Sequence, residues 1–400
     1  MQDHSGAALA TDMHARLARS HSRMALHDAS LVETQIALTR IAAPTGDESE
    51  RGAYVARRFE ALGLMDVETD RAGNVIGRRP GKTERPAVAV CAHLDTVFPR
   101  GTNLDVRRDG SRLYGPGIND NGRGLAVMLA LASEVDGESL RSDRPIEFVA
   151  TTGEEGAGDL RGAKHYFATR GSDSAAAVII DGAGDERIVH RALGSRRFRI
   201  AFEGPGGHSW AAFGAPNAVH AAAAAATEIA ALTLPLDPRT TLTVARIGGG
   251  LSVNSIPADA WLEVDLRSSS ATVLGSVAKR IVAAVQAATA AENQRRASGT
   301  AELKARVDVI GDRPCGDTPE DHPLVQAAVR VTRLIGRPPD LTMASTDANV
   351  PISLGIPAIA IGAGGRGGDA HTTAEWYDNT DGAIGAGRAL TIVVSAASLS

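Results

Sequence analysis

The sequence is poor in cysteine, with only Cys91 and Cys315 in 400 residues and no CxxC pair. Two cysteines cannot frame a disulfide scaffold, and such low usage agrees with a reducing compartment. No continuous apolar stretch approaches the roughly 18 residues that a membrane span needs. The N-terminal region also lacks the apolar segment of a secretory signal. We therefore expect a soluble cytoplasmic protein.

Aromatic residues and excess charge are also scarce. Aromatics make up 4% of the chain, and the formal net charge is −5. A balance this small gives no electrostatic argument for binding nucleic acid or an anionic membrane surface. With 43% hydrophobic and 22% charged residues, disorder and fibrous repeats are disfavoured. The length allows two or three globular domains.

Short runs rich in β-branched residues predict strands that are buried on both faces of a mostly parallel sheet. Segments between and before them have helical patterns, and this alternation is typical of α/β architecture. We expect a twisted sheet flanked by helices. The predicted strands cover residues 86–92, 145–151, 175–180 and 356–361, and the predicted helices cover 124–135 and 322–335.

The middle of the chain has a different pattern, in which apolar and polar residues alternate as in strands with one covered face. Four such strands and two alanine-rich helices predict a small α+β module of ferredoxin-like type. Because the α/β pattern resumes after residue 312, we expect this module to be inserted. The expected domains are 1–192 with 313–400, and 193–312. The strands cover 198–202, 241–247, 261–266 and 306–310, and the helices 215–232 and 272–292.

Two candidate sites follow the first predicted strand. His93 and Asp95 are two residues apart on extended chain, so their side chains point to one side and Asp95 can hold the imidazole in the tautomer that a metal needs. The glycine-rich segment 115–124 contains Asp120 and leads into a helix. It fits neither the GxGxxG nor the GxxxxGK[ST] pattern, and a carboxylate repels phosphate. Phosphate and dinucleotide binding are therefore disfavoured.

Three further sites contribute carboxylates and a histidine. Glu154 and Glu155 are adjacent between glycines, which is costly unless a cation or a shared proton offsets their repulsion. Asp181 follows a predicted strand, and His371 follows a glycine-rich loop. Each residue alone has an ordinary interpretation as a solvated turn, a cap or a surface side chain. Their convergence at the carboxyl ends of several strands favours one shared crevice.

Two histidines and three carboxylates form a mixed nitrogen and oxygen donor set. With one carboxylate shared, such a set suits two divalent ions about 3.5 to 4 Å apart in a hydrolytic centre. No thiolate contributes, so a structural zinc cage is disfavoured. We expect two divalent ions per subunit, with zinc ranked first and manganese or cobalt as alternatives.

Over roughly residues 30–395, the chain resembles the co-catalytic metallopeptidases that include carboxypeptidase G, acetylornithine deacetylase, succinyl-diaminopimelate desuccinylase, aminoacylase and peptidase T. It is most similar to a branch near peptidase T. Two departures, Asn121-Gly122 after Asp120 and Ser345 before Thr346, leave the metal set intact and the substrate open. The motifs that carry the resemblance are His93-Leu94-Asp95-Thr96-Val97, Gly153-Glu154-Glu155-Gly156, Gly206-Gly207-His208-Ser209, and Thr346-Asp347-Ala348 with His371.

The resemblance implies a division of the metal ligands. His93 and Asp181 would hold one ion, Glu155 and His371 would hold the other, and Asp120 would bridge them. Asp95 would orient His93. Glu154 would be the general base that takes a proton from the metal-bridging water and passes it to the leaving amine.

The resemblance also implies that the inserted module is a lid through which the protein forms a homodimer. His208 would reach the partner's site and stabilise the tetrahedral oxyanion. Asn254 and Arg267 match positions that contact substrate in relatives. An arginine there suits a substrate carboxylate, because its planar fork binds both oxygens.

The leading hypothesis is therefore a dinuclear metallohydrolase that cleaves the C–N (amide) bond of a small peptide or N-acyl amino acid. The alternative is an aminohydrolase or deacylase that acts on a non-peptide C–N bond of a small carboxylate-bearing molecule. A binding protein that kept the fold and lost catalysis is disfavoured, because every ligand position is filled. Neither nucleic acid nor membrane is an expected partner.

Overall fold

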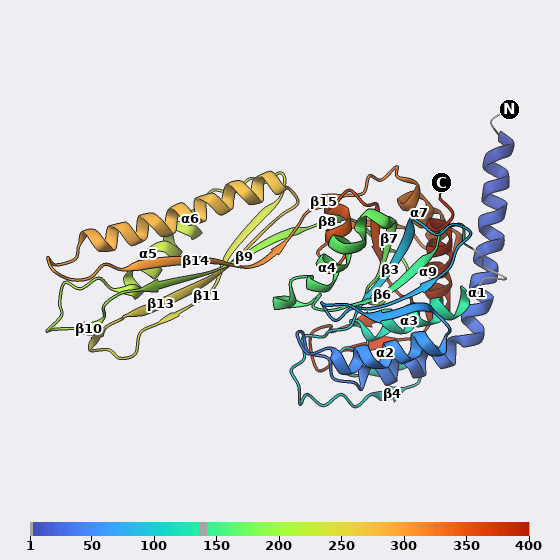
Figure 1. Ribbon diagram of the computed structural model, residues 1–400, viewed down its shortest axis with the longest axis horizontal. Helices are drawn as coiled ribbons and strands as arrows, with labels where there is room; N and C mark the ends of the chain where they lie inside the picture. The colour runs from blue at the N-terminus through green and yellow to red at the C-terminus, as the bar shows by residue number, and fades with distance from the viewer. Residues whose placement is uncertain (1–2, 136–141, 400) are drawn as a thin grey trace. The chain divides into compact units, whose positions relative to one another are not determined.

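The computed structural model describes residues 3–135 and 142–399, with side chains in the first helix from residue 13 onward. The chain forms two compact units (Figure 1). One contains the residues up to Ala192 and those from Asp317 onward, and the other is Leu193–Gly316. The first is called the α/β unit below, and the second is called the inserted unit.

The α/β unit is built on a nine-stranded sheet in the order β1-β2-β6-β3-β7-β17-β8-β15, with β16 paired to β8. The central strands β6, β3, β7 and β17 are parallel, whereas β2 and β8 pair antiparallel with their inner neighbours. The predicted α/β sheet is thus confirmed. The strands are β1 (Met65–Thr69), β2 (Val75–Arg79), β3 (Ala87–His93), β6 (Ile146–Thr151), β7 (Ser174–Ile180), β8 (Arg187–Ala192), β15 (Gly316–Asp317), β16 (Asp340–Ala344) and β17 (Ala358–Ile361).

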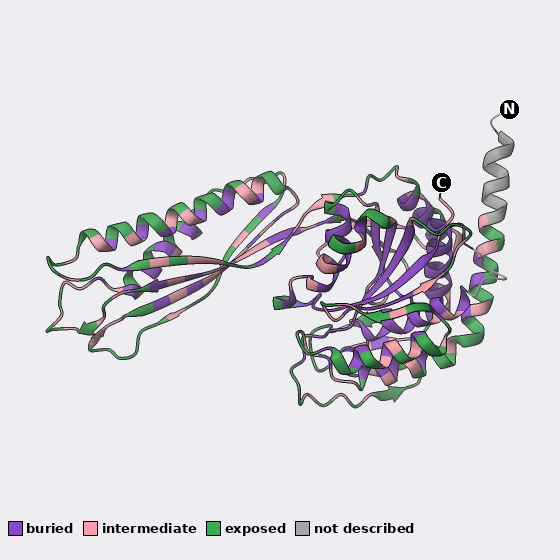
Figure 2. Cartoon of the chain, viewed as in Figure 1, coloured by how far each residue is buried: buried purple, intermediate pink, exposed green. Residues whose placement is uncertain are grey.

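Helices cover both faces of this sheet, and every residue of β3 is buried (Figure 2). Val88 and Val90 of β3 face a core shared with α1, α2, α3, α7 and α9, whereas Ala89 and Cys91 face a second core with α4 and α8. This alternation explains why the strand has a continuous apolar sequence. The helices are α1 (Asp3–Thr39), α2 (Ser49–Ala61), α3 (Gly122–Glu134), α4 (Arg161–Arg170), α7 (Pro323–Leu334), α8 (Asn349–Ser353) and α9 (Gly382–Ala396), and two 3₁₀ turns cover Gly156–Gly158 and Gly171–Asp173.

A second, antiparallel sheet of the α/β unit joins segments that are far apart in the sequence. Its order is β18-β19-β5-β4. None of these strands is predicted from the sequence, because each is three residues long and too short for an alternating pattern. The strands are β4 (Arg107–Asp109), β5 (Arg112–Tyr114), β18 (Arg366–Gly368) and β19 (Trp376–Asp378).

The inserted unit has the element order βαββαβ and the sheet order β11-β13-β9-β14, which is a ferredoxin-like arrangement. Buried and partly exposed residues alternate along β13, and its buried residues form one core with α5 and α6. A separate two-stranded ladder pairs β10 with β12. The elements are β9 (Gly194–Glu203), β10 (Gly207–His208), α5 (Ala218–Ala230), β11 (Thr240–Gly249), β12 (Ser255–Ile256), β13 (Asp259–Ser268), α6 (Ala271–Gln294) and β14 (Lys304–Arg313).

Among the described residues, one helix, α6, is long and apolar enough to cross a membrane by length and composition. Val277, Ile281 and Val285 of this helix are buried in the core of the inserted unit. Lys279 and Arg280 lie on its exposed side. The apolar residues of α6 are therefore accounted for by packing against its own sheet.

Candidate metal centre

Four of the predicted site segments meet at one edge of the central sheet. His93 is the last residue of β3, and Asp181 directly follows β7. Glu154 and Glu155 follow β6 after a short turn. Asp120 lies in the loop between β5 and α3, which we call the Asp120 loop (residues 115–121). Carboxyl ends of parallel strands share one edge of a sheet, which explains how three of these segments converge.

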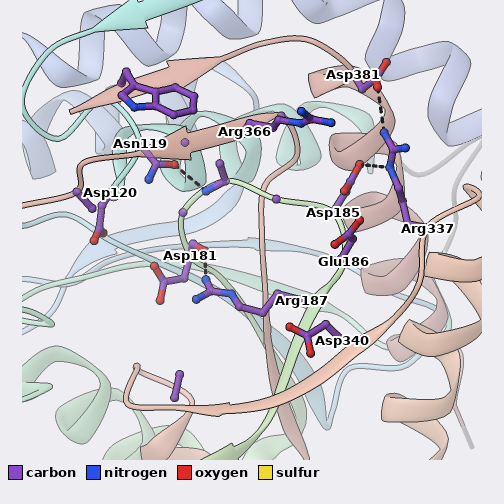
Figure 3. Close-up of a pocket in the computed structure, with 18 of the residues that line it drawn as sticks. Asn119, Asp120, Asp181, Asp185, Glu186, Arg187, Arg337, Asp340, Arg366 and Asp381 are labelled. Atoms are coloured by element: carbon purple, nitrogen blue, oxygen red, sulfur yellow. Dashed lines mark hydrogen bonds and ion pairs between the residues drawn. The ribbon is translucent and has the colours of Figure 1, made fainter. Parts of the chain in front are cut away.

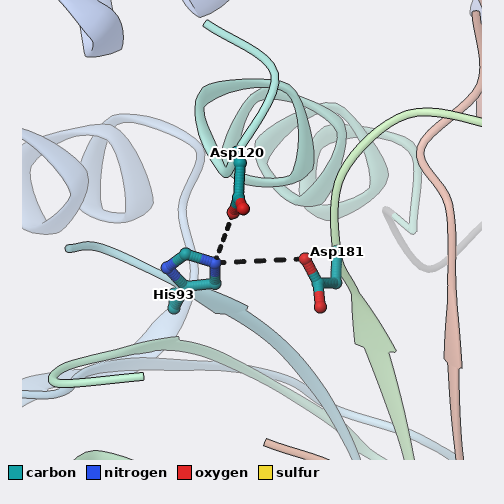
Figure 4. A group of neighbouring side chains, drawn as sticks. All are labelled: His93, Asp120 and Asp181. Atoms are coloured by element: carbon teal, nitrogen blue, oxygen red, sulfur yellow. Dashed lines mark hydrogen bonds and ion pairs between the residues drawn. The ribbon is translucent and has the colours of Figure 1, made fainter. Parts of the chain in front are cut away.

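The first group consists of His93, Asp120 and Asp181 (Figure 4). Nε2 of His93 lies 3.0 Å from Oδ1 of Asp120 and 4.0 Å from Oδ1 of Asp181. His93 is buried, and the two carboxylates are partly exposed. One ligand atom from each residue lies within 4.8 Å of the others, so the group can hold a metal ion.

The second group shares Asp120 and adds Glu155 and His371. His371 lies in the turn between β18 and β19, called the His371 turn (residues 369–375). Its Nε2 is 2.9 Å from Oε1 of Glu155 and 3.3 Å from Oδ2 of Asp120. Asp120 thus directs Oδ1 towards His93 and Oδ2 towards His371. One carboxylate is shared between the two groups.

Glu154 also lies close to potential metal ligands. Together with His93 and Glu155, it forms a third group whose ligand atoms lie within 4.8 Å of one another. All three residues are buried. Geometry alone therefore allows Glu154 to contact a metal ion or to stand beside one.

Asp95 contacts both His93 and the Glu154-Glu155 turn, and it is fully buried. Its carboxylate oxygens accept hydrogen bonds from the backbone N–H of Glu154 and from that of Glu155, each at 2.9 Å. Nδ1 of His93 lies 3.0 Å from the main-chain oxygen of Asp95 and 3.6 Å from its Oδ1. Nδ1 is thereby engaged, and Nε2 is left to face the carboxylates.

The cluster contains more carboxylates than imidazoles, and the pKa values of its members are shifted accordingly. Burial raises the pKa of Asp181, and the nearby charge of Asp120 adds to this effect. The hydrogen bond to Asp120 raises the pKa of His371 to about 9. Burial acts to raise the pKa of Asp95, but hydrogen bonds from His93 and from the backbone outweigh it and lower the pKa to about 2.

The raised pKa values of Asp181 and His371 reflect carboxylates that are crowded in a partly buried space, whereas hydrogen bonds lower the pKa of Asp95. Bound protons reduce the repulsion, and divalent cations do so more effectively because each supplies two positive charges. Carboxylate oxygens and imidazole nitrogens suit zinc, manganese and cobalt. The residues present therefore fit two divalent metal ions.

The Glu154-Glu155 turn is fixed by a buried glutamate that sequence reasoning missed. Oε1 of Glu48 accepts the backbone N–H of Gly153 at 3.1 Å, and Oε2 pairs with Nη2 of Arg161 at 2.6 Å. Gly153 has φ of +64°, and a Cβ there would lie 2.6 Å from the Arg161 guanidinium. Glycine is therefore needed for both the turn and the close approach.

Glu375 and two asparagines were also missed as site residues. Glu375 accepts three backbone N–H groups of the Asp120 loop. Asn119 and Asn121 flank Asp120 and bind the chain around Asp181. Burial raises the pKa of Glu375 to about 7, although the three backbone donors oppose the shift. No motif marks these residues, because their partners are backbone groups.

A cavity of about 860 Å³ opens beside Asp120 and Asp181 (Figure 3). At its far end, Arg337 donates hydrogen bonds to Asp185 at 3.0 Å and to Asp381 at 2.9 Å. Small-molecule sites usually have volumes of roughly 300 to 1,000 Å³. The cavity is therefore of the right size for a small substrate next to the carboxylates.

The other three predicted residues lie in the inserted unit. His208 and Asn254 are neighbours across the β10–β12 ladder, where the backbone N–H of Ser209 donates to the main-chain oxygen of Asn254 at 2.9 Å. Both side chains are exposed. Arg267 lies on β13, and its Nε donates to Oδ2 of Asp265 at 2.7 Å. The structure therefore groups His208 with Asn254 and places Arg267 in a separate ion pair.

A sequence profile of peptidase family M20/M25/M40 matches residues 89–394. The chain belongs to this family. Membership confirms the predicted class of enzyme, a metal-dependent hydrolase of C–N bonds, in a family that uses dinuclear metal centres.

Individual M20 relatives fall into more than one functional type. Carboxypeptidase G2 from Pseudomonas sp. (strain RS-16) is 26% identical over an alignment of 261 residues that covers 60% of each chain. N-carbamoyl-L-amino acid amidohydrolase from Geobacillus stearothermophilus is 27% identical over 86% of this chain and 89% of that enzyme. Aminopeptidase PepT from Bacillus cereus has a similar fold, with a TM-score of 0.73 and 23% identity over 92% of this chain and 98% of that one.

Proposed function

We propose that this chain hydrolyses the amide bond of a small peptide or N-acyl amino acid that carries a carboxylate. The observation that carries the proposal is the shared carboxylate of Asp120, which faces His93 with one oxygen and His371 with the other. Two adjoining ligand groups that share one carboxylate are the arrangement expected of a two-metal hydrolytic site.

In this proposal, His93 and Asp181 hold one ion, Glu155 and His371 hold the other, and Asp120 bridges them. Zinc is the preferred ion, with manganese or cobalt as alternatives. When bound, two divalent ions polarise the carbonyl of the scissile bond and lower the pKa of water. Asp95 engages Nδ1 of His93, so that Nε2 stays unprotonated and available.

Glu154 is the proposed general base. Its position after β6 is fixed through its own backbone N–H, which donates to Asp95. The buried carboxylate can therefore take a proton at one oxygen and return it to the leaving amine without moving its main chain.

His208 is the proposed oxyanion stabiliser and acts from a second subunit. Its Nδ1 accepts the backbone N–H of Trp210 at 3.2 Å, so the neutral ring carries its proton on Nε2. Among the described contacts of His208, none uses Nε2, so this N–H can donate to an oxyanion. Asn254, which directly precedes β12, and Arg267 are proposed to bind substrate.

We further propose that residues 193–312 form a lid and dimerisation domain. Four large apolar side chains near His208 and Asn254 are almost fully exposed in the inserted unit, as expected of a surface that a second copy covers. They are Trp210, Phe213, Leu251 and Val253. The proposed location is the cytoplasm, in keeping with two free cysteines.

The second candidate is a non-peptide amidohydrolase that acts on a small carboxylate-bearing molecule. One observation favours it, because the carbamoyl amino acid amidohydrolase aligns with 86% of this chain, whereas carboxypeptidase G2 aligns with 60%. The same ligand set and base serve both reactions, because each needs only activated water and a polarised electrophile.

The test compares Glu154→Gln with wild type on dipeptides, tripeptides, N-acyl amino acids and N-carbamoyl amino acids. Turnover of the preferred substrate should fall by about 100- to 10,000-fold while metal content stays unchanged. Glu60→Gln, at an exposed helix position, serves as the matched control. Loss of a metal ion in Glu154→Gln would instead make Glu154 a ligand, and cleavage of the non-peptide substrates alone would favour the second candidate.

A further inference from the structure

Glu375 is a fully buried carboxylate to which the proposed reaction assigns no role. It ends the His371 turn, four residues after His371 and directly before β19. Its Oε1 accepts the backbone N–H groups of Asn119 and Asp120, both at 2.8 Å. Its Oε2 accepts the backbone N–H of Gly117 at 2.9 Å. Burial of a carboxylate is costly, and these three bonds compensate for the lost water.

The main chain of Glu375 binds the same loop. Its carbonyl oxygen accepts the backbone N–H of Gly115 at 3.0 Å and thereby extends the β5–β19 ladder. Gly367 of β18 also contacts the loop, since a Cβ there would lie 2.5 Å from the side chain of Asn119. The Asp120 loop is thus joined to the hairpin that carries His371 through both backbone and side-chain contacts.

The two asparagines beside Asp120 bind the opposite flank of the loop. Oδ1 of Asn119 accepts the backbone N–H of Ala183 at 2.7 Å. Asn121 donates to the main-chain oxygen of Ile180 at 2.9 Å and accepts the backbone N–H of Gly182 at 3.2 Å. These contacts lie on both sides of Asp181. Asp120 is therefore held towards Asp181 by the asparagines and towards His371 by Glu375.

We propose that Glu375 is a positioning residue for the metal site formed by Asp120, Glu155 and His371. It sets the distance between the Asp120 loop and the His371 turn, on which the approach of Oδ2 of Asp120 to Nε2 of His371 depends. The inference rests on the proposed division of metal ligands. Partners that orient metal ligands typically change metal affinity by 10- to 100-fold when they are replaced.

The test is Glu375→Gln, which keeps the size of the side chain but replaces one acceptor oxygen with an N–H₂ donor. At least one of the three hydrogen bonds is then lost. In titrations of the metal-free protein with Zn²⁺ against a competing chelator, the Kd of one ion should rise about 10-fold or more while that of the other stays unchanged. A purely structural role would weaken both ions together.

A double-mutant cycle identifies the affected site. In a His371→Ala background, which retains only the site of His93 and Asp181, Glu375→Gln should cause no further change in Zn²⁺ affinity, because its target is already lost. An equal weakening in both backgrounds would overturn the inference. Glu375→Asp, which shortens the side chain by one methylene, provides the same comparison if Glu375→Gln does not fold.

The matched control is Glu292→Gln. Glu292 is a buried glutamate of the inserted unit that also accepts a backbone N–H, that of Asn217, at 2.8 Å. Its replacement should leave both Zn²⁺ affinities unchanged. The metal assignment itself would be refuted if the wild type bound fewer than two ions, or if His371→Ala retained both. If Glu375→Gln binds both Zn²⁺ ions with the affinities of the wild type, only the proposed role of Glu375 is refuted.

Discussion

Nε2 of His371 lies 2.9 Å from Oε1 of Glu155, although 216 residues separate them in the chain. Glu155 follows a strand of the central sheet, whereas His371 lies in a turn of the small sheet. The pair therefore depends on the relative placement of two sheets within the α/β unit. Several properties of the candidate site can be tested from this arrangement.

Replacement of His371 by alanine should reduce the metal content from two ions per chain to one. The lost ligand belongs to one group only, because His93 keeps its contacts with Asp120 and Asp181. Activity should fall by about 100-fold or more, since metal assistance is worth several kcal/mol. Metal analysis after gel filtration measures the first effect. His21→Ala, an exposed histidine of α1, should retain both ions.

Asp95→Asn should lower kcat by about 10- to 100-fold, because the carboxylate accepts the backbone N–H groups of Glu154 and Glu155 and lies 3.6 Å from Nδ1 of His93. The amide of asparagine has one acceptor oxygen, whereas both carboxylate oxygens of Asp95 accept hydrogen bonds. Thr45→Val removes only the hydroxyl that donates to Oδ2 of Asp95 at 2.9 Å, and it should have a smaller effect. Steady-state kinetics at saturating metal compare the two, and equal losses would contradict the assigned role of Asp95.

Two inactive variants should complement each other if His208 acts across a dimer. A subunit with His208→Ala keeps Glu154, and a subunit with Glu154→Gln supplies His208. In a random mixture of dimers, half are mixed and one of their two sites is complete, so about a quarter of wild-type activity should return. Subunits are exchanged and mixed dimers isolated by two affinity tags. Inactive mixed dimers would show that His208 does not act in trans.

Asp378 should contribute to stability in a pH-dependent way. The backbone and hydroxyl of Thr380 and the guanidinium of Arg112 hold the pKa of Asp378 below its usual range. A lowered pKa in the folded state adds stability above the unfolded-state pKa of about 3.9, and that stability is lost as the pH falls. Asp378→Asn should therefore lower the urea midpoint at about pH 7, and the difference should shrink towards about pH 3.

These measurements use metal-free protein in chelator, so that metal release in acid does not contribute. Asp109→Asn is the control in the same small sheet, because Asp109 is exposed and its nearest contact with Arg107 is 3.6 Å. Exposed pairs of this kind contribute little. A difference for Asp378→Asn that stays constant with pH would contradict the role of its charge.

Local patterns were sufficient to predict the central parallel strands, the four-stranded sheet of the inserted unit and the helices α3, α5, α6 and α7, but the helices α1, α2, α4 and α9 were missed. The continuous apolar sequence of β3 reflects two helix-covered faces, and the alternation in β13 reflects one. The small sheet was missed because three-residue strands carry no readable period. Glu48 and Glu375 were missed because their partners are backbone N–H groups, which leave no motif in the sequence.

By itself, the sequence determined the family, the α/β class and the residues with metal-binding chemistry, because these depend on residue type, order and short-range period. Only the tertiary structure decided which atoms face one another. It directed the two oxygens of Asp120 to different histidines and placed Glu375 against the Asp120 loop. The reason is physical: ligand distances are set by strand pairing and backbone hydrogen bonds between segments that are far apart in the chain.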